Sequence, residues 1–147
     1  MYIGRLQLKG FKSFGGSHDL ILSSGFTAIV GPNGSGKSNL LDALRWSLGD
    51  SSAARLRINR QSDLLFQGSA SKEGAREGEV TLHLREGEKS CIVRRRVVAP
   101  DGATSLFVDN MRRTLTELDA IKREWKLEGA RLACIGQGEV QEALKQS

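Results

Sequence analysis

Polar and apolar residues alternate near the start of the chain. Residues 2–9 (YIGRLQLK) predict a half-buried strand, because alternation with period two places apolar side chains on one face. The loop GFKSFGG follows, and SHDLIL (17–22) predicts a second strand. GFTAIV (25–30) is more continuously apolar and predicts a third, more deeply buried strand.

Leucines recur at helical spacing directly after the third strand, and they predict a helix over residues 37–48. The apolar face of this helix holds Leu40, Leu41, Leu44 and Leu48, and the other face holds Asn39, Asp42 and Arg45. Gly49 is a plausible C-terminal glycine for this helix.

The rest of the chain alternates between polar loops and short apolar segments. Residues 50–79 predict a long functional loop with a small strand at DLLF (63–66). Three antiparallel strands are then predicted at EVTLHLR (79–85), SCIVRRRVVA (90–99) and TSLFVD (104–109). The remaining elements are an amphipathic helix at 114–127 with Thr114 or Thr116 at its cap, a buried strand at 130–136 and a further helix starting at 139.

Length and composition add limits to this pattern. A chain of 147 residues is long enough for one domain with a real core. No apolar run approaches the roughly 20 residues of a membrane helix, and the N-terminus lacks the apolar core of a signal peptide, so we expect a cytoplasmic protein. Cys91 and Cys134 are expected to be inert core thiols, and Trp46 and Trp125 to be packing residues. His18 and His83 are isolated, and no chemistry is assigned to them.

A strand, a glycine-rich loop and a helix meet at residues 28–44. Residues 31–38 (GPNGSGKS) match the phosphate-binding pattern G-x-x-x-x-G-K-[ST]. Glycines let backbone N–H groups converge on a phosphate, and the first turn of the helix adds further donors. Lys37 is expected to reach the β- and γ-phosphates, and Ser38 to hold Mg²⁺.

A hydrolytic site of this type normally needs a second carboxylate at the end of an apolar strand. Asp109, after SLFV, is the one candidate, but Asp109-Asn110 reads as a hairpin turn and no glutamate follows. The sequence therefore predicts a phosphate cradle without its catalytic carboxylate.

The motifs around this loop resemble the N-terminal head segment of the SMC (structural maintenance of chromosomes) proteins. The matching stretches are LKGFKSF (8–14), VGPNGSGKSN (30–39), ALRWSLGD (43–50), SSAARLR (51–57), DLLFQGS (63–69) and CIGQGEVQEAL (134–144). GFKSF and RW-x-LG-[DE] favour SMC over the related RecF and RecN heads.

The resemblance implies a fold and a division of labour. It implies an α/β P-loop fold of the ABC type, in which a half Rossmann-like core stands beside an antiparallel β subdomain. The chain would be the N-terminal lobe, and the C-terminal lobe would carry the signature motif and an Asp-Glu pair. A coiled coil and hinge would separate the two lobes. The implied ligands and partners are ATP, Mg²⁺, a second head in a homodimer, double-stranded DNA and a kleisin-type subunit.

Residue roles follow from the same resemblance. The phosphates would be wrapped by Pro32, Asn33, Gly34, Ser35, Gly36, Lys37, Ser38 and Asn39. Gln137 matches the Q-loop glutamine, which touches Mg²⁺ and the attacking water. Arg57 matches the arginine that approaches the nucleotide, with Arg55 as the alternative. Lys9 and Ser13 are expected near the nucleotide, and Asp63 near its adenine side.

A basic surface for DNA is the last expectation. It would be formed by Arg60, Arg112, Arg113 and Lys122, with help from the run Arg94-Arg95-Arg96, of which at most two side chains share one face. Two departures from the family affect this region. Ile58-Asn59-Arg60 stands where the family shows glycines, and the basic pair Arg112-Arg113 is slightly shifted. The formal net charge of +5 is compatible with a polyanionic partner.

Three other functions remain open at this stage. A RecF- or RecN-like repair ATPase would share the head but not RWSLGD. A self-contained P-loop kinase would need its own carboxylate, lid and acceptor site. A plain DNA-binding module would bind DNA with an affinity that does not depend on ATP.

Overall fold

The computed structural model describes residues 2–21, 35–50 and 52–124. In chain order the elements are β1 (Tyr2–Phe11), β2 (Phe14–Ile21), α1 (Ser35–Ser47), α2 (Ala53–Leu56), the 3₁₀ helix η1 (Gln61–Leu64), β3 (Glu77–Glu86), β4 (Lys89–Val98), β5 (Ala103–Val108), β6 (Met111–Arg112) and α3 (Leu115–Glu124). The strands predicted at 25–30 and 130–136 and the helix expected from 139 lie outside the described residues.

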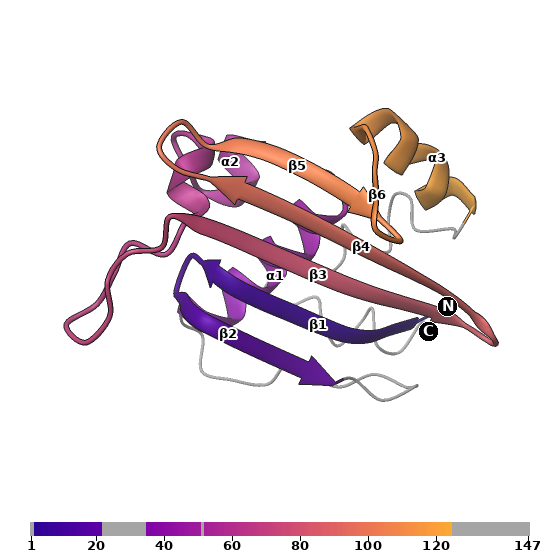
Figure 1. Ribbon diagram of the computed structural model, residues 1–147, viewed down its shortest axis with the longest axis horizontal. Helices are drawn as coiled ribbons and strands as arrows, with labels where there is room; N and C mark the ends of the chain where they lie inside the picture. The colour runs from indigo at the N-terminus through magenta and orange to yellow at the C-terminus, as the bar shows by residue number, and fades with distance from the viewer. Residues whose placement is uncertain (1, 22–34, 51, 125–147) are drawn as a thin grey trace.

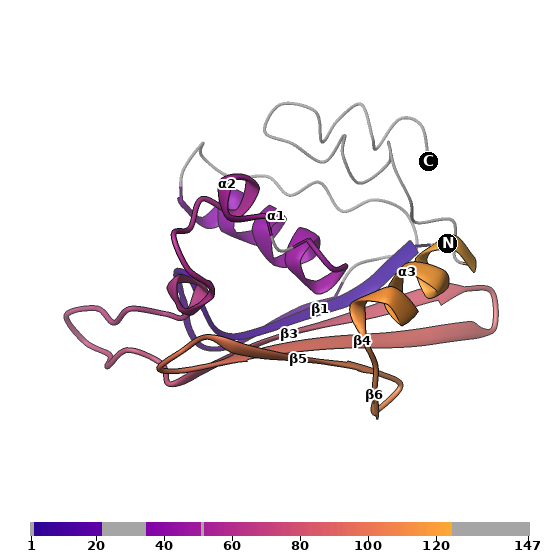
Figure 2. The same cartoon turned by 90° about the horizontal axis from the view of Figure 1, so that it is seen from above.

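The described strands form one antiparallel sheet in the order β2-β1-β3-β4-β5-β6 (Figure 1). The register places Leu6 opposite Leu82 and Leu8 opposite Val80. Directly opposed residues point to the same face, so these apolar side chains line one side of the sheet. Figure 2 shows α1, α2 and α3 on the same side of the sheet. The alternating strands predicted from the sequence are therefore confirmed for β1, β3, β4 and β5.

Helix α1 packs on the apolar face of the sheet, against β3 and β4. Leu44 and Leu48 are buried, as the helical spacing predicts. Trp46 is fully buried, and its ring centroid lies 5.4 Å from that of Phe11, which confirms a packing role. Because α1 rests on a broad sheet, the position of its N-terminal turn is set by the core.

The C-terminal end of α1 is held by two cations from other elements. Arg95 Nη1 donates to Trp46 O at 2.7 Å, and the guanidinium lies 4.8 Å from the centre of the Trp46 ring. Lys122 Nζ, from α3, donates to Leu48 O at 2.9 Å. Trp46 O also accepts the Gly49 N–H at 3.0 Å, so Arg95 is a second donor to this carbonyl. Both cations lie at the end of the helix where its dipole favours positive charge. Burial lowers the pKa of Arg95 to about 10, so the guanidinium keeps its charge and its contact at neutral pH.

The central strands divide the three consecutive arginines as the alternation predicts. Arg95 is only 3% exposed and faces α1, whereas Arg94 and Arg96 lie half-buried on the other face. The guanidinium of Arg94 stacks over Phe107 at 4.6 Å, and Arg96 forms an ion pair with Glu77. Arg95 therefore belongs to the core, and it contributes nothing to a basic surface.

The loop predicted between the first two strands, GFKSFGG, is longer than the turn in the structure, so this prediction was wrong in length. β1 continues through Phe11 and β2 starts at Phe14, so only Lys12 and Ser13 form the turn. Lys12 has a φ of 48°, in the left-handed region, and its backbone N–H donates to Leu64 O at 2.7 Å. This hydrogen bond to a distant segment stabilises the short turn. The glycines in the sequence had suggested a longer loop.

The strand predicted at 63–66 is also wrong. Residues Gln61–Leu64 form η1, and Leu65 makes a single bridge to Phe11. The short helix α2 forms in the same segment, where the sequence predicts a loop. A run of three apolar residues is too short for periodicity to separate a strand from a helical turn, and burial against β1 decides between them.

The elements after β5 follow the sequence closely. Asp109 and Asn110 have φ values of 50° and 67° and form the predicted turn into β6. Thr114, rather than Thr116, caps α3: its Oγ1 accepts the Glu117 N–H at 3.1 Å, and Glu117 Oε1 accepts the Thr114 N–H at 3.0 Å. None of the helices in the described part of the chain is long and apolar enough to cross a membrane.

We expect Gly102→Ala to destabilise the protein by about 2–5 kcal/mol, because two costs add. Gly102 has a φ of +78°, and a Cβ there would lie 2.6 Å from Ser62 N in η1. Gly87→Ala is the matched control, since its φ is +60° but nothing lies within 4 Å of the added carbon. Urea denaturation of both variants measures the difference. Equal losses in the two variants would show that the contact between η1 and the β4–β5 turn is unimportant.

Candidate functional site

A buried carboxylate lies on the face of α1 that the sequence assigns to the polar side. Asp42 is 2% exposed, and Asn39, one turn earlier on the helix, is 9% exposed. The sequence places both opposite the leucines, and the structure buries them under two other segments. The reason is that side chains from the β1–β2 turn and from the residue after α2 pair with them.

Lys12 provides the first partner from the β1–β2 turn. Its Nζ donates to Asp42 Oδ2 at 2.6 Å and to Leu56 O, at the end of α2, at 2.5 Å. The side chains of Lys12 and Asp42 are 10% and 3% exposed. A buried charge is tolerated where it is paired and hydrogen-bonded, so this contact joins three segments of the chain at one point.

Arg57 provides the second partner. Its Nη2 donates to Asp42 Oδ2 at 2.5 Å and to Asn39 Oδ1 at 3.2 Å, and its side chain is 53% exposed. Asn39 in turn donates from Nδ2 to Ser13 Oγ at 2.8 Å. Arg57, Asn39 and Ser13 were all predicted to lie at the nucleotide site, and the structure brings these three together.

We call the set Lys12, Ser13, Asn39, Asp42 and Arg57 the α1 cluster. Two cations share one carboxylate in it, so the cluster carries an excess positive charge. Its outermost member, Arg57, is the member most open to solvent among the charged three. An anion bound beside the N-terminal half of α1 would complement both this charge and the helix dipole.

The phosphate-binding motif runs into the start of this helix. Ser35, Gly36, Lys37 and Ser38 form the first turn of α1, directly before Asn39. The predicted cradle residues Pro32, Asn33 and Gly34 lie outside the described residues, as does Gln137. Within the described ranges, no group of three His, Cys, Asp or Glu side chains is arranged to hold a metal ion.

Two other predicted site residues do not join the α1 cluster. Lys9 is exposed and follows Leu8 in β1, so the alternation of the strand points it away from the face that carries α1. The Asp63 carboxylate accepts the backbone N–H groups of Arg60 and Asn59 at 3.1 and 3.0 Å, and these bonds lower its pKa. Asp63 therefore stabilises the turn into η1.

Two of the four basic residues predicted to meet DNA, Arg60 and Arg112, lie at opposite ends of β5. Arg60 precedes η1, which touches the β4–β5 turn at Gly102. Arg112 pairs with Phe107 at the other end of β5, a six-residue strand, so roughly 20 Å separates the two positions. The four residues therefore do not form one continuous patch within the described part of the chain.

Three of these four residues have protein partners. Arg60 Nε lies 3.4 Å from Asp63 Oδ1, and Arg113 Nη1 lies 3.1 Å from Glu117 Oε2. Lys122 contacts both Leu48 O and the Asp119 carboxylate, the latter at 3.5 Å. Exposed pairs of this kind are weak and exchange readily with solvent or a phosphate. The DNA contacts stay predictions.

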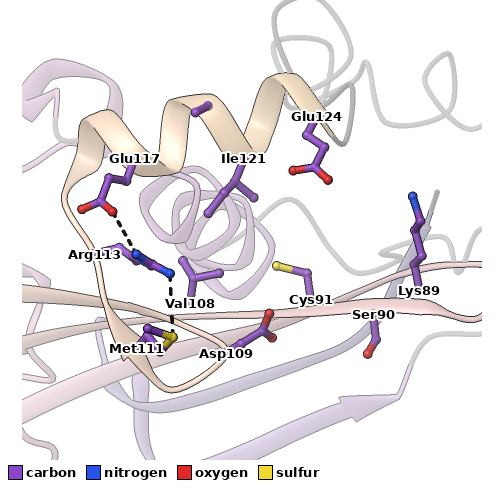
Figure 3. A pocket seen from close by; sticks show the side chains of 11 residues that line it. Lys89, Ser90, Cys91, Val108, Asp109, Met111, Arg113, Glu117, Ile121 and Glu124 are labelled. Carbon is purple, nitrogen blue, oxygen red and sulfur yellow. Dashed lines mark hydrogen bonds and ion pairs between the residues drawn. The ribbon is translucent and has the colours of Figure 1, made fainter.

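A cavity of about 600 Å³ lies between the β4 and β5 ends and α3, apart from the α1 cluster (Figure 3). Cys91 and Val108 form part of its floor, and Glu117 and Ile121 line it from α3. Cys91 is 4% exposed, and burial raises the pKa of its thiol to about 11. The thiol stays protonated at neutral pH, which agrees with the predicted inert role; Cys134 lies outside the described residues.

Sequence reasoning missed the two charged residues at the centre of the α1 cluster. Lys12 stands inside the GFKSF motif, and Asp42 stands three residues after Asn39, a spacing that places two side chains on one helical face. That spacing was an available signal for a shared contact. The partner residues come from segments 15 to 44 positions away, which no local pattern reveals.

Comparison with known proteins identifies the family to which the chain belongs. The family described as "RecF/RecN/SMC N terminal domain" matches residues 2–133. A curated relative, the chromosome partition protein Smc of Pyrococcus furiosus, is 44% identical over 125 residues, which are 80% of this chain and 10% of that protein.

Two solved structures are similar over most of the chain. One belongs to a study titled "Structural biochemistry of ATP-driven dimerization and DNA stimulated activation of SMC ATPases" and has a TM-score of 0.83 and 38% identity, covering 100% of this chain and 93% of that one. The other is an Smc head bound to the C-terminal winged-helix domain of ScpA, with a TM-score of 0.77 and 42% identity, covering 84% of this chain and 40% of that one.

The fold of the described residues, with these matches, is that of part of an SMC ATPase head of the ABC type. The chain belongs to the RecF/RecN/SMC N-terminal domain family, and within it to the SMC heads. The family resemblance stated from the motifs is confirmed. The chain spans about a tenth of the length of the Pyrococcus relative.

Proposed function

We propose that the chain is the ATP-binding lobe of a chromosome-organising SMC ATPase. The observation that carries this proposal is the coincidence of two features on α1. The helix begins within the motif GPNGSGKS, and its next turn is held by Arg57 through Asn39 and Asp42. A phosphate at the start of α1 would therefore meet backbone N–H groups, Lys37 and a nearby guanidinium.

Within this proposal each site residue has a physical task. Residues 32–39 wrap the phosphates, Lys37 supplies a compact positive charge, and Ser38 offers a hydroxyl to Mg²⁺. Gln137 contacts Mg²⁺ and the attacking water. Arg57, the residue directly after α2, approaches the nucleotide. The bound Mg²⁺ would neutralise charge that develops on the phosphate oxygens.

The active centre is composite in this proposal. A C-terminal lobe supplies the signature motif and the Asp-Glu pair, and two such heads enclose two ATP molecules. ATP binds the engaged pair better than the separated heads, and hydrolysis separates them again. This cycle acts on double-stranded DNA in the cytoplasm, with a kleisin-type subunit, to organise and segregate chromosomes.

Reconstitution of the head tests the composite centre. We expect the 147-residue chain alone to hydrolyse no ATP above background. Addition of the C-terminal lobe from the same protein should restore turnover, because it supplies the missing carboxylates. The C-terminal lobe alone is the control. Robust turnover by this chain without that lobe would contradict the proposal, and so would an inactive two-lobe head.

A further inference from the structure

Arg57 is anchored through one nitrogen only. Nη2 makes both of its hydrogen bonds, to Asp42 Oδ2 at 2.5 Å and to Asn39 Oδ1 at 3.2 Å. A guanidinium carries five N–H donors, and the three on Nε and Nη1 have no protein acceptor within the described residues. With half of the side chain exposed, this end of the guanidinium is open to a ligand.

The backbone of Arg57 is fixed independently of that contact. Its N–H donates to Ala54 O at 3.2 Å, and the next residue, Ile58, donates to Ala53 O at 2.9 Å. The φ of Arg57 is 57°, a left-handed conformation that few residues other than glycine adopt. Since the backbone is held by these bonds, the direction of the long side chain depends on what holds its far end.

Asp42 is the group that holds that end. Its carboxylate is 3% exposed, and Lys12, which is 10% exposed, neutralises it from the interior. Lys12 is itself held by Leu56 O, directly before Arg57. Lys12 therefore neutralises the Asp42 carboxylate while the same carboxylate also binds Arg57. Two cations and one carboxylate leave a net positive charge that can attract an anionic oxygen.

We propose that Asp42 is a positioning residue for Arg57. It fixes Nη2 so that Nε and Nη1 are presented to the phosphate oxygens of a nucleotide bound at the start of α1. This inference rests on the proposed function. Asp42 itself touches no ligand in it, and acts through the guanidinium alone.

A double-mutant cycle in the two-lobe head tests the inference. We expect Asp42→Asn to lower kcat for ATP by roughly 10- to 100-fold, because a mispositioned group loses contacts made in the transition state. KM for ATP should change by less than about threefold. In an Arg57→Ala background, Asp42→Asn should have no further effect on kcat. Equal losses in both backgrounds would show a merely structural role and overturn the proposal.

Two further variants control for the loss of a carboxylate as such and for impaired folding. Asp19→Asn removes an exposed carboxylate that pairs with Arg5 in the β1–β2 hairpin, and it should leave kcat unchanged. Asp42→Asn leaves Lys12 buried without an anion, which can impair folding. The double variant Lys12→Gln, Asp42→Asn removes both charges and should reproduce the loss of kcat. If it folds and keeps full kcat, the proposal is wrong.

Arginine side-chain NMR separates this inference from the proposed function. In a two-lobe head with ¹⁵N-arginine in this chain, anchoring of Nη2 should slow rotation about the Nε–Cζ bond and resolve the Arg57 Nη signals. Arg57→Lys identifies them by their disappearance. Asp42→Asn should merge the signals even if the head hydrolyses no ATP. Signals that stay resolved in Asp42→Asn would overturn the positioning role, whatever the ATPase result.

Discussion

Lys37→Ala should weaken ATP binding by the two-lobe head by at least about 100-fold, because it removes the main positive charge facing the phosphates. Lys37 lies in the first turn of α1, where the helix dipole and free backbone N–H groups also favour an anion. Those groups remain in the variant, so we expect weak residual binding of nucleotide and no measurable turnover. Isothermal titration with ATP and Mg²⁺ measures the loss.

Lys89→Ala is the matched control for this experiment. Lys89 is an exposed lysine at the start of β4, beside the cavity under α3. Its removal changes the net charge of the chain by the same amount as Lys37→Ala, and ATP affinity should not change. Unaltered affinity in Lys37→Ala would refute the role assigned to the phosphate loop.

Trp46→Ala should destabilise the protein by about 3–5 kcal/mol, the usual cost of deleting a large buried aromatic side chain. Trp46 is fully buried, packs against the Phe11 ring at a tilt of 33° and lies under the guanidinium of Arg95. Its loss would open a cavity beneath α1 and leave the buried Arg95 without its ring partner. Because domains are stable by only about 5–15 kcal/mol, we expect a large fall in the unfolding midpoint, measured by circular dichroism in urea.

Two variants make this result interpretable. Trp46→Phe keeps an aromatic ring, and it should cost less than Trp46→Ala because the indole Nε1 has no hydrogen-bond partner among the described residues that would be lost. Met111→Ala truncates an apolar side chain that is 57% exposed and should change stability by less than about 0.5 kcal/mol. A Trp46→Ala protein as stable as Met111→Ala would show that α1 is not anchored through this ring.

The strands and main helices were predictable because their signals are local. The alternation in β4 separated Arg95 from Arg94 and Arg96, and the sequence limited the cap of α3 to Thr114 or Thr116, of which Thr114 is the cap in the structure. The residue types at Asp109-Asn110 predicted the hairpin turn that the structure shows there. Each of these features depends on residues within a few positions of one another, and a short window of sequence contains them all.

The segment after α1 was harder because long-range contacts decide it. DLLF, at 63–66, has the composition of a strand, yet η1 forms there and the backbone of Lys12 donates to Leu64 O. The short β1–β2 turn depends on the same contact. No periodicity in either segment encodes its partner, so both predictions were wrong.

The sequence alone determined the family, and it predicted a phosphate-containing ligand at the start of α1. The spacing of glycines, Lys37 and Ser38 is a local requirement of phosphate binding, and it can be recognised in the sequence without knowledge of the fold. Only the tertiary structure decided that Asp42 is buried and that Lys12 and Arg57 converge on it. The physical reason is that a carboxylate on the polar face of a helix is normally solvated, and only its pairing with two cations from separate segments makes its burial favourable.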